Sequence, residues 1–283
     1  MLSQAFFSFE NFLDLATIIE LKRLQKQVTY FLYSTVILKK GKILDASYSY
    51  YDYTKSIERI DNILNNSDSN YDKHTGIPSK DSLTYNNGFY VDVTVLFVDI
   101  RGSKELSSRH TRPVLAKIYR AYISEVITVM KGNTCINEIY IEGDGLWAVF
   151  NTTTKDDVNS VFNTAFTIAS LIDILNVKLS KKKYSTLKVG IGIDDGESLY
   201  IKAGYKGSGI QEVVWIGKVV GQTAALCSHG NNTINDREIM VSSQVYSSLS
   251  EHNKSLLVEN ISRNCYHGNV IRTDMNEWVK TNT

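Results

Sequence analysis

The sequence predicts an α+β fold in which strands and helices alternate along 283 residues. A nearly uninterrupted β-branched run at 91–100 is typical of a strand buried on both faces. Two apolar runs within 135–150, separated by a Gly-Asp-Gly triplet, predict a β-hairpin. Apolar residues recur with helical spacing at 114–130 and 158–179, on either side of that hairpin. The order strand, helix, hairpin, helix follows.

The N-terminal third of the chain differs in character from the rest. Apolar residues at mixed three- and four-residue spacings predict an amphipathic helix over 6–38. Residues 41–90 are rich in Tyr, Asp, Asn and Ser, and predict a helix near 53–64 followed by a loop. We therefore divide the chain into an N-terminal helical extension and linker, 1–90, and a catalytic domain, 91–283.

The second half of the predicted domain continues the alternation of strands and helices. The predicted elements are strands at 187–193, 199–203 and 212–216, a helix at 219–227, a short strand after Arg237, a helix at 242–249 and two strands around 261–270.

Composition limits the partners and the compartment. Lys and Arg number 31 against 30 Asp and Glu, so no global field attracts nucleic acid or an anionic membrane. The N-terminus has no basic region and carries acidic residues within its apolar stretch, unlike a signal peptide or a membrane span. Three scattered cysteines fit neither a disulfide framework nor a metal motif. We expect a cytoplasmic protein that binds neither nucleic acid nor membrane.

Two aspartates are the strongest candidates for chemistry. Asp99 ends the buried strand, and Asp144 lies in the hairpin turn. Either one alone is compatible with a surface carboxylate or a helix cap, but adjacent antiparallel strands would bring both into one cleft. Close carboxylates raise each other's pKa unless cations compensate. The pair therefore predicts two divalent metal ions, Mg²⁺ or Mn²⁺, that act on a nucleoside triphosphate.

The residues around Asp99 supply further candidates. Backbone N–H groups of Arg101, Gly102 and Ser103 are suited to cradling phosphate oxygens. The Arg101 side chain, which we expect to be exposed in its loop, is suited to binding the triphosphate or the base. Phe97 shares the strand face of Asp99, and either forms a wall of the base pocket or belongs to the core.

Several motifs, taken in order, resemble the class III nucleotidyl cyclases. They are LFVDIRGS, IYIEGDGLWAVF, VGIGIDDG and VVWIGKVVGQTAALCS. The resemblance implies a ferredoxin-like βαββαβ core and conversion of a nucleoside triphosphate to a cyclic nucleotide. It also implies metal ligands at Asp99, Asp144 and the carbonyl of Ile100, with active sites formed across a homodimer.

The sequence departs from this family at four positions. Tyr140 and Val214 stand where purine cyclases read the base with Lys and Asp, or with Glu and Cys. Gly221 and Ala225 stand where the family presents Asn and Arg to ribose and phosphate. The candidate replacement cations are Arg101, Lys202, Lys206 and Lys218.

A closer resemblance covers more of the chain. The segments GIPSKDSLTYNNGFYVDVTVLFVDIRGS, HTRPVLAKIYRAYISEV and IKAGYKGSGIQEVVWIG are similar to bacterial pyrimidine cyclases of the Pycsar anti-phage system. This resemblance implies cyclisation of UTP or CTP, with a slight preference for UTP, to a product that activates a separate effector. Two alternatives stay open: a purine cyclase with unusual base recognition, and a degenerate cyclase fold that binds nucleotide as a sensor.

Overall fold

The computed structural model describes residues 48–205 and 211–283. Residues 51–204 and 211–283 form one compact unit. The helix predicted at 6–38 lies outside the described residues.

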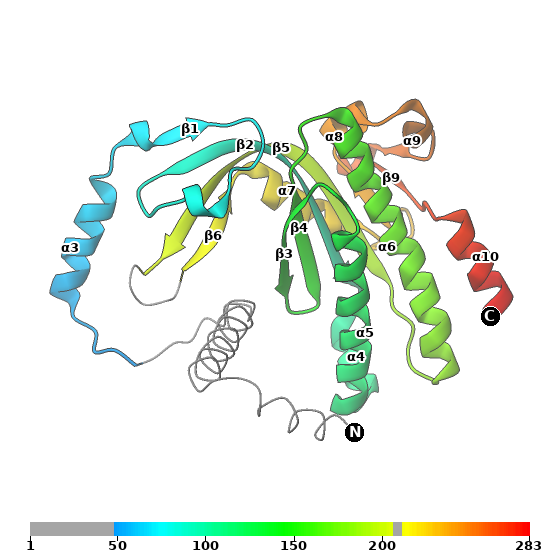
Figure 1. Cartoon of the computed structure of the whole chain (residues 1–283). Helices are drawn as coiled ribbons and strands as arrows, with labels where there is room; N and C mark the ends of the chain where they lie inside the picture. Colours follow the sequence, from blue (N-terminus) through cyan, green and yellow to red (C-terminus); the bar gives the residue numbers. More distant parts are fainter. Residues whose placement is uncertain (1–47, 206–210) are drawn as a thin grey trace, which may run out of the picture. The chain divides into compact units, whose positions relative to one another are not determined.

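The centre of this unit is a mixed sheet that runs from the edge strand β3 in the order β3-β4-β2-β5 and continues beyond β5 (Figure 1). The strands and the helices between them are β2 (Gly88–Ile100), α5 (Arg112–Lys131), β3 (Ile136–Glu142), β4 (Gly145–Phe150), α6 (Lys155–Lys181) and β5 (Val189–Gly204). Their sequence order is βαββαβ, and β2 pairs antiparallel with both β4 and β5. The predicted α+β, ferredoxin-like core is confirmed.

Strand β2 is buried on both faces, as its composition predicts. Leu96, Val98 and Ile100 belong to a core that includes apolar residues of α5 and α6. Val91, Val93 and Val95 alternate with them and belong to a second core on the opposite face. Asp99 shares the face of this second core, because its side chain alternates with that of Val98.

Among the described helices, only α6 is long and apolar enough to span a membrane. Twelve of its residues are nevertheless buried within the unit. Its apolar residues include Val161, Phe162 and Ile168, which pack in the same core as β2. We therefore assign its hydrophobicity to packing against the sheet.

Helix α7 (Lys218–His229) lies on the face of the sheet that carries Asp99. It lies very close to β5, because Gly190 and Gly192 carry no side chains. A Cβ at Gly192 would lie 2.3 Å from the backbone nitrogen of Cys227, and one at Gly190 would lie 2.4 Å from the carbonyl oxygen of Cys227. These glycines stand opposite Asp99 and Phe97 on β2, so they set the distance between α7 and the predicted site.

Residues before β2 extend the sheet and cover part of the second core. The elements here are α3 (Tyr53–Leu64), η1 (Asp68–Asn70), β1 (Tyr71–Lys73) and η2 (Lys80–Ser82). The helix predicted near 53–64 is confirmed. Strand β1 pairs parallel with the start of β2, and Ile77 and Leu83 pack in the second core. The segment around η2 thus lies over the sheet face that carries Asp99.

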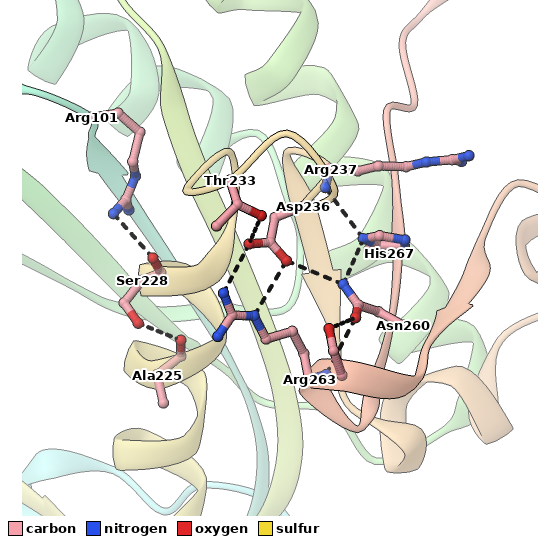
Figure 2. Close-up of polar contacts among 10 residues, drawn as sticks. Arg101, Ala225, Ser228, Thr233, Asp236, Arg237, Asn260, Arg263 and His267 are labelled. Atoms are coloured by element: carbon pink, nitrogen blue, oxygen red, sulfur yellow. Dashed lines mark hydrogen bonds and ion pairs between the residues drawn. The ribbon is translucent and has the colours of Figure 1, made fainter.

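The C-terminal part adds strands beyond β5 and a final helix. Its elements are β7 (Ile239–Val241), α8 (Ser243–Ser248), α9 (Glu251–Ser255), β8 (Val258–Asn260), η3 (Ile261–Arg263), β9 (Cys265–Gly268) and α10 (Thr273–Asn282). A buried polar network ties this part together (Figure 2). Asp236 accepts hydrogen bonds from Arg263, Thr233 and Asn260, and Asn260 in turn contacts His267.

Some predicted boundaries were wrong. The strands predicted at 187–193 and 199–203 are one strand, β5, because the acidic residues between them stay paired with β2. There Asp195 accepts a hydrogen bond from the Thr94 hydroxyl at 2.7 Å. A short helix, α4 (Ser103–Arg109), occupies part of the predicted loop. Helices α9 and α10 were not predicted.

Candidate active site

Asp99 and Asp144 lie near each other at one end of the sheet. Asp99 is the penultimate residue of β2, and Asp144 lies in the turn between β3 and β4. A Cβ at Gly145, next to Asp144, would lie 3.3 Å from Oδ1 of Asp99. Partial burial, and after it the negative charge of Asp144, raises the pKa of Asp99. The two carboxylates therefore share one electrostatic environment.

Arg101 is the nearest cation to this pair, and its position differs from the expected one. Its side chain is 20% exposed, and its Nη2 lies 3.3 Å from Oδ2 of Asp99. The same Nη2 donates to the carbonyl oxygen of Cys227 at 3.1 Å. Nη1 lies 3.5 Å from the carbonyl oxygen of Ser228 (Figure 2). The carbonyls at the C-terminal end of α7 are suited to hold a cation. Arg101 thus bridges Asp99 to α7 instead of standing free in a loop.

The residues around Asp99 fit a hydrated divalent cation. Asp99 and Asp144 carry hard carboxylate oxygens of the kind that such a cation prefers, and the carbonyl of Ile100 would be a third oxygen ligand by family resemblance. In the described part of the chain, neither Tyr122 Oη nor Arg101 Nε has a hydrogen-bond partner, although both atoms are buried. The charges of Asp99 and Asp144 both raise the pKa of Tyr122, after burial itself. No cluster of three or more His, Cys, Asp or Glu suited to a metal occurs among these described residues, so the site has two carboxylates.

The predicted phosphate loop is shorter than expected. The backbone N–H of Arg101 donates to the carbonyl of Lys188 at 2.7 Å, which continues the pairing of β2 with β5. This N–H is therefore not available to a phosphate, contrary to our expectation. Gly102 precedes α4 with a φ of 70°, and Ser103 is the first residue of that helix. The predicted phosphate contacts are thus limited to Gly102 and Ser103.

A row of aromatic rings crosses the sheet beside the aspartates. Phe97 stacks on Trp147 with ring centroids 5.3 Å apart, and Trp147 stacks on Tyr140 at 4.1 Å. The three residues lie on β2, β4 and β3, at directly paired positions. Phe97 is two residues before Asp99 on the same face, so the row begins next to the carboxylates.

A buried carboxylate lies at the far end of this row. Glu138, which is two residues before Tyr140 and shares its face of β3, has a side chain only 4% exposed. It accepts hydrogen bonds from the Tyr140 hydroxyl and from Nε1 of Trp215. Lys80 Nζ lies 2.5 Å from Glu138 Oε1. Glu138 was not among the predicted site residues, although its spacing from Tyr140 on a predicted strand would have placed the two side chains together.

The structure brings Trp215, and not Val214, to Tyr140. Both residues lie on β6 (Gln211–Ile216), whose side chains alternate between its faces. Trp215 is buried in the second core, whereas Val214 is 37% exposed. Trp215 Nε1 lies 3.2 Å from the Tyr140 hydroxyl oxygen. Alternation along β6 thus separates the two residues predicted to contact the base.

Helix α7 has neither Asn nor Arg at positions 221 and 225, where the resemblance led us to look for them. Gly221 and Ala225 are both exposed, and a Cβ at Gly221 would meet nothing within 4 Å. Of the candidate cations, Lys218 is the exposed first residue of α7, and Lys202 Nζ lies 5.4 Å from the ring centroid of Tyr85. Lys206 lies outside the described residues. Arg101 is the candidate nearest to Asp99.

A ferredoxin-like core with two carboxylates at the end of its central strands defines a nucleotidyl cyclase type of catalytic domain. Residues 86–278 match the adenylate and guanylate cyclase catalytic domain family, and the chain belongs to that family. It is a nucleotidyl cyclase. Members of this family act on nucleotides, generally depend on divalent metal ions and are expected to be dimeric.

Two relatives are similar over most of the chain. A uridylate cyclase from Treponema porcinum is 34% identical over 207 residues, covering 72% of each chain. A uridylate cyclase from Gulbenkiania mobilis is 34% identical over 225 residues, covering 73% of this chain and 87% of the relative.

Solved structures share the fold. The adenylyl cyclase CyaB from P. aeruginosa has a TM-score of 0.53 and 20% identity, covering 61% of this chain and 85% of that chain. A class III adenylyl cyclase-like ATP-binding protein from Pseudomonas aeruginosa has a TM-score of 0.54 and 15% identity, covering 84% and 50%. At these identities the likeness concerns the fold alone.

Proposed function

We propose that this chain is a pyrimidine nucleotide cyclase that converts UTP or CTP, with a preference for UTP, to the 3′,5′-cyclic nucleotide and pyrophosphate. The observation that carries the proposal is that the Tyr140 side chain is held in one position. This residue stands at a base-reading position, where its ring is stacked on Trp147 and its hydroxyl is bonded to Glu138 and Trp215. A fixed aromatic ring at this position leaves less room than a flexible Lys or Glu, which favours the smaller pyrimidine base.

The relatives support the same substrate class. Two proteins that are 34% identical to this chain are uridylate cyclases, and the matched segments cover about three quarters of it. The preference for UTP over CTP rests on these relatives and on the polarity of the base pocket. The two bases differ at position 4, where an oxygen acceptor replaces a donor amine.

The proposed reaction is an intramolecular attack of the ribose 3′-hydroxyl on the α-phosphorus. The bond between the 3′-oxygen and phosphorus forms, the bond to the β-phosphate bridging oxygen breaks, pyrophosphate leaves, and the hydroxyl proton is released. Gly102 and Ser103 contact the triphosphate, and Phe97 and Tyr140 line the base pocket, whereas Val214 lies on the other face of β6 and takes no part in it. Holding the two reacting groups in line converts binding energy into rate.

Asp99 and Asp144, with the Ile100 carbonyl, would hold two divalent ions, Mg²⁺ or Mn²⁺. When bound, such ions lower the pKa of the attacking hydroxyl and neutralise the leaving pyrophosphate. Arg101 has two roles in this proposal: it balances the charge of Asp99 in the free enzyme, and it supplies the cation that Ala225 does not. We further propose that the active sites form across a homodimer.

A product assay with all four nucleotides tests the proposal. The purified protein is incubated with Mn²⁺ and ATP, GTP, CTP or UTP in turn, and the products are resolved by mass. We expect cyclic UMP, with less cyclic CMP. Cyclic AMP or cyclic GMP as the main product would instead identify a purine cyclase with unusual base recognition. No cyclic product from any nucleotide would refute cyclase activity.

A nucleotide sensor without turnover is the second candidate, and the exposed Gly221 and Ala225 favour it. In cyclases the equivalent positions supply groups to ribose and phosphate, and here neither residue has a polar side chain. Calorimetric titration with UTP distinguishes the two functions. Tight binding without pyrophosphate release would identify a sensor, whereas stoichiometric release of pyrophosphate and cyclic nucleotide would identify an enzyme.

The biological setting is part of the proposal. By resemblance to Pycsar cyclases, the product would act as a second messenger on a separate effector during anti-phage defence, in the cytoplasm. We keep the division into a helical extension, 1–90, and a catalytic domain, 91–283, as a proposal. Phage challenge of cells that carry this chain with its native neighbouring genes tests the setting, and unchanged phage titres would refute it.

A further inference from the structure

Glu138 controls the direction in which the Tyr140 hydroxyl can hydrogen-bond. An ionised carboxylate only accepts hydrogen bonds, so in this contact the Tyr140 hydroxyl must donate its single proton to Glu138. The exposed Lys80 pairs with the other oxygen of Glu138 at 2.5 Å, and an ammonium group only donates, so both oxygens of Glu138 act as acceptors. The hydroxyl proton of Tyr140 is therefore used in the hydrogen bond to Glu138 and cannot be donated to a substrate.

Trp215 determines how many lone pairs of the Tyr140 hydroxyl oxygen stay unused. Nε1 of Trp215 donates to both Glu138 Oε2, at 2.9 Å, and the Tyr140 hydroxyl oxygen, at 3.2 Å. A hydroxyl oxygen has two lone pairs, and Trp215 uses one of them. Burial, and after it the hydrogen bond to Glu138, raises the pKa of Tyr140 well above its usual range, so the phenol keeps its proton. What Tyr140 offers to a substrate is one acceptor and no donor.

The position of this acceptor is fixed. The Tyr140 ring stacks on Trp147 with an interplanar angle of 13°, and Trp147 in turn donates its Nε1–H to Glu142 at 3.1 Å. A change in the χ1 rotamer of Tyr140 would break the stacking and both hydrogen bonds of the hydroxyl. A fixed group of this kind discriminates between ligands better than a flexible one, because it cannot turn to suit a different partner.

A single acceptor held opposite position 3 of the base distinguishes the two pyrimidines. Uracil has one donor on its base-pairing edge, the N3–H, whereas cytosine has a bare nitrogen at position 3 and an amine at position 4. This step rests on the proposed function, in which the base lies against Tyr140. We propose that Glu138 is a positioning residue that holds Tyr140 as a hydrogen-bond acceptor for the N3–H of uracil and thereby selects UTP over CTP.

The test is the ratio of kcat/KM for UTP to that for CTP. In Glu138→Gln, the amide N–H₂ can donate to Tyr140 and release its proton toward the base, so we expect the ratio to fall at least about tenfold. Tyr140→Phe removes the hydroxyl and should also lower the ratio. In the Tyr140→Phe background, Glu138→Gln should then have no further effect on the ratio, because the group through which it acts is absent.

Glu142→Gln is the matched control. Glu142 lies on the same face of β3 and accepts from the indole N–H of Trp147, and in Glu142→Gln the amide oxygen can still accept that bond, so Trp147 stays stacked on Tyr140. We expect this variant to keep the wild-type ratio. The melting temperature of each variant is measured in parallel, so that a loss of stability is separated from a change in selectivity.

Three outcomes would overturn the inference. One is a wild-type preference for CTP. Another is an unchanged ratio in Tyr140→Phe, which decides the question even if Glu138→Gln fails to fold. The third is an equal fall of kcat/KM for both nucleotides in Glu138→Gln, which would make Glu138 merely structural. A wild-type enzyme that makes no cyclic pyrimidine overturns the proposed function and this inference with it.

Discussion

Replacing Gly192 with Ala should push α7 away from the sheet. The added Cβ would lie 2.3 Å from the nitrogen of Cys227 and 2.4 Å from the carbonyl oxygen of Thr223, both backbone atoms of α7. Real Cβ atoms essentially never approach closer than 3.0 Å, so the helix must move by about 0.7 Å to relieve the closer contact. Overpacking of this kind costs about 1–3 kcal/mol. For a unit of this size, each kcal/mol lowers Tm by about 2–4 °C.

The same displacement should reach the active site. The carbonyl of Cys227 holds Arg101 at 3.1 Å, and Arg101 pairs with Asp99. A shift of α7 therefore loosens the cation beside the proposed metal ligands. Because misplacement by about 1 Å can cost about 100-fold in rate, we expect kcat to fall by about 10- to 100-fold.

Gly196→Ala is the matched control on the same strand. A Cβ at Gly196 would meet Val219 at 3.7 Å, an ordinary van der Waals distance. We expect this variant to keep its Tm within about 2 °C and its kcat within about twofold. Thermal unfolding by circular dichroism and a pyrophosphate-release assay measure both quantities. Equal Tm and kcat for the two variants would refute the packing argument.

Three further predictions concern the carboxylates. Asp99→Ala or Asp144→Ala should lower turnover more than about 100-fold with little change in Tm, because each removes a metal ligand; either variant with near-wild-type activity would contradict the assignment. Hydrogen bonds, chiefly from Arg263, lower the pKa of Asp236 to about 2. Its contribution of about 2 kcal/mol is present above the unfolded pKa of 3.8 and is lost as pH falls toward 2, so Asp236→Asn should destabilise at pH 7 and lose its effect near pH 2 in urea titrations. Burial raises the pKa of Glu238 to about 7, so the folded protein loses up to about 3 kcal/mol as pH rises from 4.5 through 7. Glu238→Gln should therefore raise the urea midpoint at pH 8 but not at pH 4, and a midpoint unchanged at pH 8 would contradict this.

The core of the fold was predictable because its signals are local. The β-branched run of β2 and the glycine-flanked turn between β3 and β4 specify a buried strand and a hairpin wherever they occur. Strand β5 shows the limit of such signals. The sequence from Asp194 to Glu197 has the composition of a turn, but its pairing with β2 keeps it extended. Long-range pairing overrode local propensity there.

The candidate site likewise contains residues that local patterns predict and residues that they do not. Asp99 and Asp144 were predicted as site residues because each follows a local pattern, a strand end and a hairpin turn. The burial of Arg101 was not predicted, because its partners Cys227 and Ser228 lie more than 120 residues away on α7. Loop position alone indicated exposure, and the packing of α7 against β5 decided otherwise.

The sequence by itself therefore determined the βαββαβ order of the core and the reaction class, and it indicated the two carboxylates as candidate site residues. Only the tertiary structure decided the hydrogen bonds of the Tyr140 hydroxyl. Glu138 and Tyr140 are neighbours on one strand, but Lys80 comes from the segment before β2 and Trp215 from β6. Hydrogen bonds between such distant residues depend on how the chain packs, and a local pattern along the sequence does not predict them.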